Sequence, residues 1–156
     1  MDLKIQFDAA AVLRAMERAP DSTVEEMRRA LLESCRLVQQ GAREKHKFRA
    51  RTGMLERAID YHVDISKCEG VIEIDSAVAP YGKWVHQGTS PHLIVPKNKQ
   101  SLRWAGAGGK FIFAKKVHHP GTKKDEFLYE AAERSRIEIN AIFARHIDTA
   151  TKEAGL

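Results

Sequence analysis

The sequence predicts an α+β protein, in which N-terminal helices and a C-terminal helix pack on a mostly antiparallel β-sheet. Three patterns carry this prediction. Apolar residues recur every three or four positions between residues 24 and 42 and again from residue 128 onward, whereas the region between them alternates apolar and polar residues. Helices that flank a run of short strands are typical of α+β folds.

Length and composition indicate one soluble globular domain. The chain has 156 residues, of which 43% are hydrophobic and 30% are charged, a balance that supports a single core. We therefore expect residues 1–156 to form one domain. No apolar run approaches the ~20 residues that cross a bilayer, and the N-terminus has no apolar signal core. We therefore expect no membrane partner and no export.

The first part of the chain predicts a short strand and two helices. Residues 3–7 alternate as a strand does, and a short helix should follow and end at Pro20. The next helix should begin at an N-cap formed by Asp21 or Ser22 and present one apolar stripe. Cys35 lies on that stripe, so we expect it to be buried. Since Cys68 is the only other cysteine, no disulfide framework is indicated, which favours synthesis in a reducing, intracellular compartment.

The middle of the chain predicts a series of strands. "YHVDIS" and "GVIEIDS" should form a hairpin, "YGKWVHQG" and "HLIVP" should extend the sheet, and "SLRWAGAGGKFIFAKKV" should add two strands around a glycine-rich turn. In the "YGKWVHQG" strand, Tyr81 and Trp84 should point to opposite faces. Gly88 and Thr89 should end that strand. Before the strands, Gly53 should permit the chain reversal that follows the long helix.

Aromatic residues interleave with lysine and arginine in these strands. Such a surface could stack on nucleic-acid bases. The alternation is also what a half-buried sheet requires, and this second interpretation is favoured. The aromatic residues to which this interpretation applies, as core residues of the sheet, are Tyr81, Trp84, Trp104, Phe111 and Phe113.

The stretch "VHHPGTKKDEFL" should turn a strand into the closing helix. Pro120 and Gly121 should form the turn. Thr122 or Asp125 should cap the helix that follows, which should extend to about Lys152.

No pattern in the chain indicates bond-making chemistry. The histidines lack the compact spacing of zinc ligands, and the adjacent His118 and His119 would point to opposite faces of a strand. The chain has no G-x-S-x-G elbow, and "GAGG" lacks the Lys-Ser/Thr ending of a P-loop. We therefore expect no catalytic residue, no metal and no cofactor, and we interpret residues 106–109 as a flexible hairpin tip. A hydrolase that uses His86, His118 or His119 with an acid is the least favoured alternative.

The net charge is +5, and the densest basic cluster is "REKHKFRAR", residues 43–51. Basic residues are favourable at helix C-termini, so a solvated helix end is the favoured interpretation of this cluster. If the cluster contacts DNA instead, Arg43, Lys47 and Arg51 are the candidates. A small basic nucleic-acid-binding domain is therefore the alternative function that the charge leaves open.

Three stretches occur in an order and at a spacing that together suggest a family: "RTGMLERAI", "APYGKWVHQGTSPHLIVPKNKQSLRW" and "KKVHHPGTKKDEFLYEA". The combination resembles the neck or tail-completion proteins of long-tailed bacteriophages, which are often labelled minor tail component. The resemblance covers residues 52–132. Family members often have a proline before the Phe-Leu pair, where this chain has Glu126. The positions that carry the motifs are Gly53, Tyr81, Trp84, Gly88, Thr89, His119, Pro120, Gly121 and Phe127.

The resemblance implies a structural virion protein that acts in head–tail joining or tail completion and is made in the host cytoplasm, not an enzyme. It implies a ring of identical subunits, a hexamer in the virion, between a head-completion (connector) protein and the tail terminator protein. A heterologous interface would close such a ring. Genomic DNA in the lumen would make contacts without base specificity, at Arg43, Lys47 and Arg51. The residues expected at the interface with another copy or a partner are Gly88, Thr89, Ser90, His92, Gly106, Gly108 and Gly109.

Overall fold

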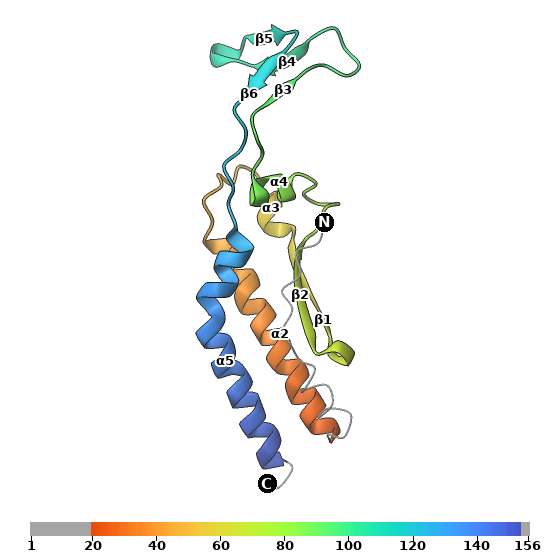
Figure 1. Ribbon diagram of the computed structural model, residues 1–156, viewed down its shortest axis with the longest axis vertical. Coiled ribbons are helices and arrows are strands. Elements are labelled where there is room, and N and C mark those ends of the chain that lie inside the picture. The colour runs from red at the N-terminus through yellow and green to blue at the C-terminus, as the bar shows by residue number, and fades with distance from the viewer. Residues whose placement is uncertain (1–19, 154–156) are drawn as a thin grey trace.

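The computed structural model describes residues 20–153. These residues form an elongated molecule, with two long helices and a hairpin at one end and a slender β-arm at the other (Figure 1). The class is α+β, as the sequence predicts. The strand predicted at residues 3–7 and the short helix predicted after it lie outside the described residues.

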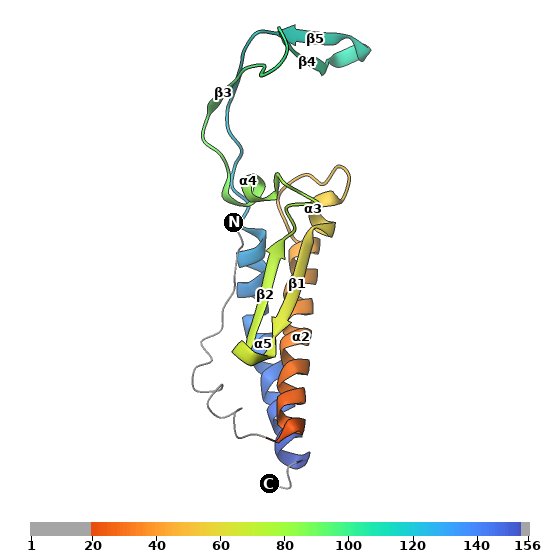
Figure 2. The same cartoon turned by 90° about the vertical axis from the view of Figure 1, so that its right-hand side faces the viewer.

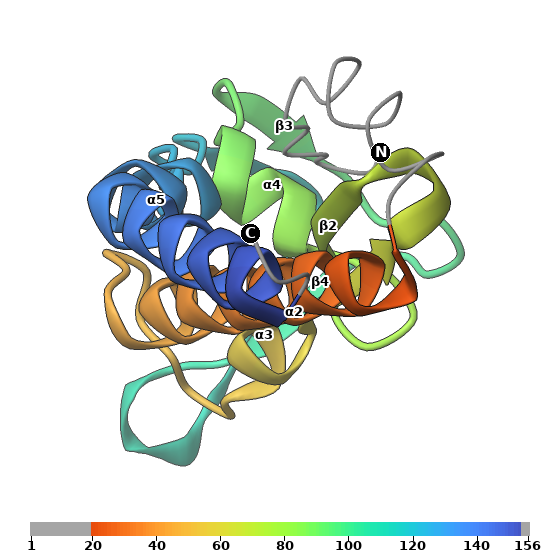
Figure 3. The same ribbon diagram turned by 90° about the horizontal axis from the view of Figure 1, so that it is seen from below.

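Two long helices form the main part of the molecule. Helix α2 (Asp21–Glu44) and helix α5 (Phe127–Glu153) lie side by side and run in opposite directions (Figures 1 and 3). Each helix buries one stripe of residues spaced by three or four, which is why the predicted periodicity was informative. The buried stripe of α2 is Glu26, Ala30, Leu31, Ser34, Cys35, Val38 and Ala42, and that of α5 is Phe127, Leu128, Ala131, Ser135, Ile139, Ile142 and Ala150.

Helix α2 does not begin with the predicted cap. Asp21 is its first helical residue, and no side chain caps it. The carbonyl of Pro20 accepts hydrogen bonds from the backbone N–H groups of Thr23 and Val24, at 2.9 and 3.3 Å. The carbonyl that precedes the first turn therefore provides the first helical acceptor, and the Asp21 carboxylate contributes through its charge at the positive end of the helix.

The predicted first hairpin is present. Strands β1 (Ile59–Asp64) and β2 (Glu69–Ile74) pair antiparallel, with Ile59 opposite Ile74 and Asp64 opposite Glu69. The short helix η1 (Ile65–Lys67) and Cys68, in the left-handed region at φ 49°, connect them. Ile59 and Ile72 belong to the same buried cluster as Cys35 and Val38 of α2, so the inner face of the hairpin packs on that helix (Figure 2).

Two short helices lie where the arm leaves the body. Helix α3 (Met54–Arg57) follows Gly53, whose φ of 67° lies in the left-handed region, consistent with the predicted chain reversal. Helix α4 (Gly82–Gln87) occupies the segment "YGKWVHQG" that the alternation predicted to be a strand. That prediction is wrong because Gly82 and His86, one helical turn apart, both turn inward and are buried. A Cβ at Gly82 would lie 2.6 Å from a methyl group of Ile74.

Beyond α4 the chain forms the arm, which we define as residues 88–122. Strand β3 (His92–Ile94) pairs with β6 (Val117–His119), and β4 (Leu102–Ala105) pairs with β5 (Phe111–Ala114) around the turn η2 (Ala107–Gly109). Both pairs are antiparallel, as predicted. The strands of the described residues nevertheless form three separate two-stranded pieces and not one continuous sheet. Of these three pieces, the β1–β2 hairpin packs on the long helices, while the arm projects away from them (Figure 2).

Among the described residues, no helix combines the length and the apolar character that crossing a bilayer requires.

Candidate functional site: the arm and its base

Close backbone contact at its base holds the arm in place. The N–H of Thr89 donates to the carbonyl of Thr122 at 2.9 Å, and the N–H of Thr122 donates back at 3.1 Å. Gly121 has φ +88°, and a Cβ there would lie 2.2 Å from the carbonyl oxygen of Thr89. Gly88 has φ +73°, and a Cβ there would lie 2.7 Å from the carbonyl oxygen of Thr122. Gly88 and Thr89, two of the predicted interface residues, therefore lie in the closed base of the arm and are half-buried.

Asp125 binds the loop that follows α2 and does not cap α5. Its carboxylate oxygen Oδ2 accepts hydrogen bonds from the backbone N–H groups of Lys47 and Phe48, at 2.6 and 2.7 Å. Helix α5 begins at Phe127, and the carbonyl of Glu126 accepts from the N–H of Glu130. The predicted N-cap at Thr122 or Asp125 is therefore wrong. The buried carboxylate satisfies two backbone N–H groups that have converged on it. Because those donors lie far away in the chain, the residues around Asp125 could not predict this contact.

His86 of α4 packs into the same junction. Its ring lies 5.2 Å from the rings of Phe127 and Tyr129, measured between centroids, and only 3% of the residue is exposed. Its Nε2 has no hydrogen-bond partner among the described residues. Burial lowers the pKa of His86, against the opposing influence of Glu126 and Asp125. The neutral ring therefore serves as part of the apolar contact between α4 and the start of α5.

The β4–β5 hairpin exposes apolar side chains on both of its faces. The register places Arg103 opposite Phe113 and Ala105 opposite Phe111 on one face, and Trp104 opposite Ile112 on the other. The exposed fractions are 63% for Phe113, 55% for Phe111, 45% for Ile112 and 41% for Trp104. The guanidinium of Arg103 lies over the ring of Phe111, 4.4 Å from its centroid.

The aromatic residues predicted to form a sheet core are therefore on the surface. None of the described helices covers Phe111, Phe113 and Trp104, because the hairpin stands apart from α2 and α5 (Figure 1). Tyr81 and Trp84, which were expected in the same core, are 41% and 48% exposed beside α4. For the arm, the alternation correctly predicted the two strands of a hairpin. It could not predict whether another element of the fold would cover them.

The glycine tip of the arm is open. Gly108 and Gly109 have φ of 73° and 77°, and a Cβ at either would meet nothing within 4 Å. Gly106 differs, because the side chain of Ile112 lies close to it. A Cβ at position 106 would lie 2.7 Å from the Cδ1 atom of Ile112. Of the predicted tip residues, Gly108 and Gly109 thus have open space around them, while Gly106 lies against Ile112 within the hairpin.

The histidines of the arm do not form a metal site. The rings of His92 and His119 stack 4.9 Å apart, and His118 points to the other face, opposite Leu93. His92, predicted at the interface, is exposed, and its Nδ1 lies 2.9 Å from the carbonyl oxygen of Ser90, also exposed. Within residues 20–153, no group of three His, Cys, Asp or Glu side chains is placed to hold a metal ion.

The basic cluster after α2 is divided among different roles. The helix ends at Glu44, so the basic residues that follow do not share a helical face. Arg43 donates to the carbonyl of Ile59 at 2.6 Å, and Lys47 is paired with Glu130. Arg51 is exposed and makes no ion pair with the described residues. Of the three predicted DNA-facing residues, two therefore make contacts within the fold.

The positive charge of the chain is concentrated elsewhere. Residues 76–124 contain nine Lys and Arg and no Asp or Glu, and six of those basic residues lie in the arm. The other described residues, 20–75 and 125–153, contain eighteen Asp and Glu against fourteen Lys and Arg. This excess of positive charge is visible in the sequence when charges are summed over long segments. The search for closely spaced basic residues pointed to residues 43–51 instead. The arm is therefore strongly basic, whereas the other described residues, 20–87 and 123–153, carry eighteen Asp and Glu against seventeen Lys and Arg and are close to neutral.

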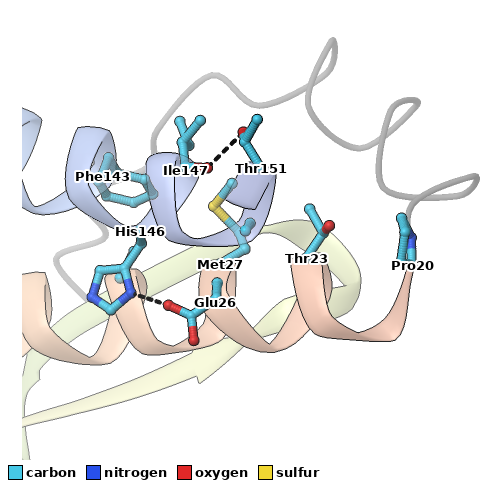
Figure 4. A pocket seen from close by; sticks show the side chains of 10 residues that line it. Pro20, Thr23, Glu26, Met27, Phe143, His146, Ile147 and Thr151 are labelled. Carbon is cyan, nitrogen blue, oxygen red and sulfur yellow. Dashed lines mark hydrogen bonds and ion pairs between the residues drawn. The ribbon is translucent and has the colours of Figure 1, made fainter. Parts of the chain in front are cut away.

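A pocket of about 280 Å³ lies between the far ends of α2 and α5 (Figure 4). Met27, Phe143 and Ile147 contribute apolar lining. At its edge, Nδ1 of His146 lies 2.6 Å from Oε2 of Glu26, and Nε2 of His146 lies 3.2 Å from Oε2 of Glu33. The hydrogen bond from His146 is the largest cause that lowers the pKa of Glu26. The ionisable groups at this pocket, Glu26 and His146, are thus already paired across the two helices, which indicates a structural role.

Three comparisons bear on the identity of the chain. No family model, no curated protein and no solved structure matches it. The function must therefore be inferred from the fold and surface of the chain itself.

Proposed function

We propose that this protein is a structural subunit of a long-tailed phage or prophage, which forms a ring in the neck that joins the filled head to the tail or completes the tail. The observation that carries the proposal is the arm, whose β4–β5 hairpin exposes Trp104, Phe111, Ile112 and Phe113 away from the body. This arm lies within residues 52–132, where the sequence resembles neck and tail-completion proteins.

The physical reason is that such a hairpin needs a partner. A two-stranded hairpin is marginally stable alone in water, and exposed apolar patches mark interaction sites. Here both faces carry large apolar groups, so burying one face would still leave the other in water. An assembly that places the hairpin between neighbouring proteins covers both, which suits a subunit of a closed ring.

The position in the neck defines the other partners. A head-completion protein would bind on one side of the ring and a tail terminator protein on the other, with DNA in the lumen. Of the three residues predicted to face DNA, Arg51 is the one that makes no hydrogen bond or ion pair within the described residues and could face phosphates without base specificity. This role needs no catalytic residue and no cofactor.

A complementation experiment tests the proposal. A phage lacking the gene should produce filled heads and separate tails, and the wild-type protein supplied in trans should restore joined particles. The variant Phe111→Ser/Phe113→Ser should fold but leave heads and tails apart in electron micrographs. Val78→Ser, which changes an exposed apolar residue outside the arm, is the matched control and should restore joining. Joined, infectious particles formed without the protein would refute the proposal.

A nucleic-acid-binding module is the second candidate, because residues 76–124 lack any carboxylate. Binding of this kind would depend steeply on salt, since it would release counterions from phosphates. The exposed aromatic residues of the arm would stack on bases. Fluorescence anisotropy with labelled single- and double-stranded DNA at low and high salt tests this candidate. Micromolar or tighter binding that Phe111→Ser/Phe113→Ser abolishes would favour it over the ring.

A further inference from the structure

The arm carries positive charge that the described fold does not neutralise. Residues 88–122 contain six Lys and Arg and no Asp or Glu. The guanidinium of Arg103 lies over the ring of Phe111. The other five side chains are exposed and make no hydrogen bond or ion pair with the described residues: Lys97, Lys99, Lys110, Lys115 and Lys116. The arm is therefore an open cationic surface, which an anionic partner would stabilise.

The β4–β5 hairpin holds three of these lysines at its two ends. Lys110 directly precedes strand β5, and its carbonyl accepts a hydrogen bond from the N–H of Gly106 at 2.8 Å. Lys115 and Lys116 directly follow the strand. A strand rises about 3.3 Å per residue, so the backbone positions of Lys110 and Lys115 lie about 17 Å apart along the hairpin. A partner that meets both ends therefore carries negative charge over that length, as a nucleic acid does.

The turn of the hairpin argues against a membrane surface as that partner. Protein segments that bind the lipid interface bury large apolar side chains in it. The turn that would enter first is η2 (Ala107–Gly109), which carries no side chain larger than a methyl group and is followed by Lys110. A basic segment without acidic residues is instead the electrostatic feature of a nucleic-acid-binding surface.

We propose that the arm binds the phosphate backbone of double-stranded DNA, with Lys110 at one end of the β4–β5 hairpin and Lys115 and Lys116 at the other. Lysine ammonium groups contact phosphates without reading bases, so the binding has no sequence specificity. The inference goes beyond the proposed ring, because the contact needs the charge of the arm and not a particular number of subunits. It also differs from a base-stacking module, since the bases of a duplex are already stacked and leave Phe111 and Phe113 to contact neighbouring proteins.

This inference moves the DNA contact away from the basic cluster at residues 43–51. In that cluster, Arg43 donates to the carbonyl of Ile59, and Lys47 is paired with Glu130. A duplex that bound there would compete with these contacts. The lysines of the arm have no such contact with the described residues. The arm therefore offers more unpaired positive charge to a polyanion than the cluster does.

Fluorescence anisotropy of the full chain with a labelled DNA duplex, over a series of salt concentrations, tests the proposal. The variant Lys110→Gln/Lys115→Gln/Lys116→Gln should weaken binding at low salt by about tenfold or more. It should also reduce the slope of log affinity against log salt by about 2–3, because each phosphate contact contributes about 0.9 to that slope. Since the three lysines are exposed and unpaired within the described residues, the variant should fold as the wild type does, which circular dichroism checks.

Two control variants separate the arm lysines from net charge and from the aromatic rings. Lys45→Gln/Arg49→Gln/Arg51→Gln also removes three positive charges, from exposed residues outside the arm. It should bind the duplex nearly as the wild type does, because its net charge equals that of the arm variant while the lysines of the arm remain. Phe111→Ser/Phe113→Ser should retain duplex binding, since the phosphates are contacted by lysine.

Other results overturn the inference in distinguishable ways. If the wild type does not bind the duplex at low salt, or if the control triple variant loses as much affinity as the arm variant, the arm is not the DNA contact. If Phe111→Ser/Phe113→Ser abolishes duplex binding, phosphate contact by lysine alone is wrong. If the wild type binds polyglutamate or phosphatidylserine vesicles but not the duplex, the partner is an acidic protein or a membrane. The phage complementation experiment tests the assembly role separately, since joined particles formed without the protein would refute that role and leave DNA binding by the arm intact.

Discussion

The carboxylate of Asp125 lies 2.7 Å from the backbone nitrogen of Phe48 and joins the base of the arm to the loop that leaves α2. The backbone N–H of Lys47 donates to the same oxygen, Oδ2 of Asp125, at 2.6 Å. The ring of Phe48 in turn packs edge-on against Phe127, with centroids 5.2 Å apart. One buried carboxylate thus holds the end of the first long helix against the start of the second, at the point from which the arm projects.

Replacement of Asp125 should be the most costly polar substitution at this junction. Asp125→Ala removes two charge-assisted hydrogen bonds and leaves two backbone donors unpaired, so we expect the free energy of unfolding to fall by about 2–4 kcal/mol. Glu126→Ala is the control, because its ion pair with Lys124 is largely exposed and should contribute less than about 1 kcal/mol. Urea denaturation measures both. Equal losses for the two variants would contradict the role assigned to Asp125.

His86 should make stability depend on pH in a defined window. Its pKa is lowered from 6.5 because burial disfavours the charged ring. The unfolded chain therefore binds a proton near pH 6.5 that the folded chain does not, so stability is full above pH 6.5 and falls as pH drops from there through the folded pKa. His86→Gln should remove this part of the slope. The lowered pKa of Glu26 acts in a separate window, below pH 4.5. Thermal unfolding between pH 5 and 8 is the measurement, and an unchanged slope in His86→Gln would exclude this origin.

The basic cluster should separate into a residue that stabilises the fold and one that does not. Arg43→Gln loses the 2.6 Å hydrogen bond to the carbonyl of Ile59 and should cost about 1–2 kcal/mol, because the donor is charged. Arg51→Gln should change stability by less than about 0.5 kcal/mol, since Arg51 is exposed. Comparison of the two chemical-denaturation midpoints decides this. A substantial loss in Arg51→Gln would show a contact that the described residues do not contain.

Two glycines with similar backbone conformations should respond very differently to alanine. Gly121 and Gly109 have φ of +88° and +77°, so both substitutions carry the strain of a left-handed residue, about 1 kcal/mol. At Gly121 the new methyl group would also lie 2.2 Å from the carbonyl oxygen of Thr89, which should break the base of the arm. Amide hydrogen exchange at Thr89 and Thr122 should accelerate in Gly121→Ala and stay unchanged in Gly109→Ala. Protection retained in Gly121→Ala would mean that the base of the arm accommodates the methyl group without breaking these hydrogen bonds, and would contradict the role assigned to Gly121.

The sequence by itself determined the elements whose patterns are local. The spacing of apolar residues predicted α2 and α5, because a helix that packs on one side repeats every 3.6 residues whatever covers it. Alternation around short turns predicted the β1–β2 and β4–β5 hairpins for the same reason. The segregation of positive charge into residues 76–124 was also present in the sequence, although it is visible only when charge is summed over segments.

Tertiary structure alone decided what each pattern packs against. Residues 82–87 form a helix because Gly82 fits against Ile74 and His86 packs on Phe127, contacts between segments far apart in the chain. Alternation in the arm marks strands with apolar faces, but no local pattern states whether another element covers those faces, and here none of the described elements does. Asp125 binds Lys47 and Phe48 in place of its own helix because folding brings those two donors to it. Periodicity follows from backbone geometry, whereas burial depends on partners that only the folded chain brings together.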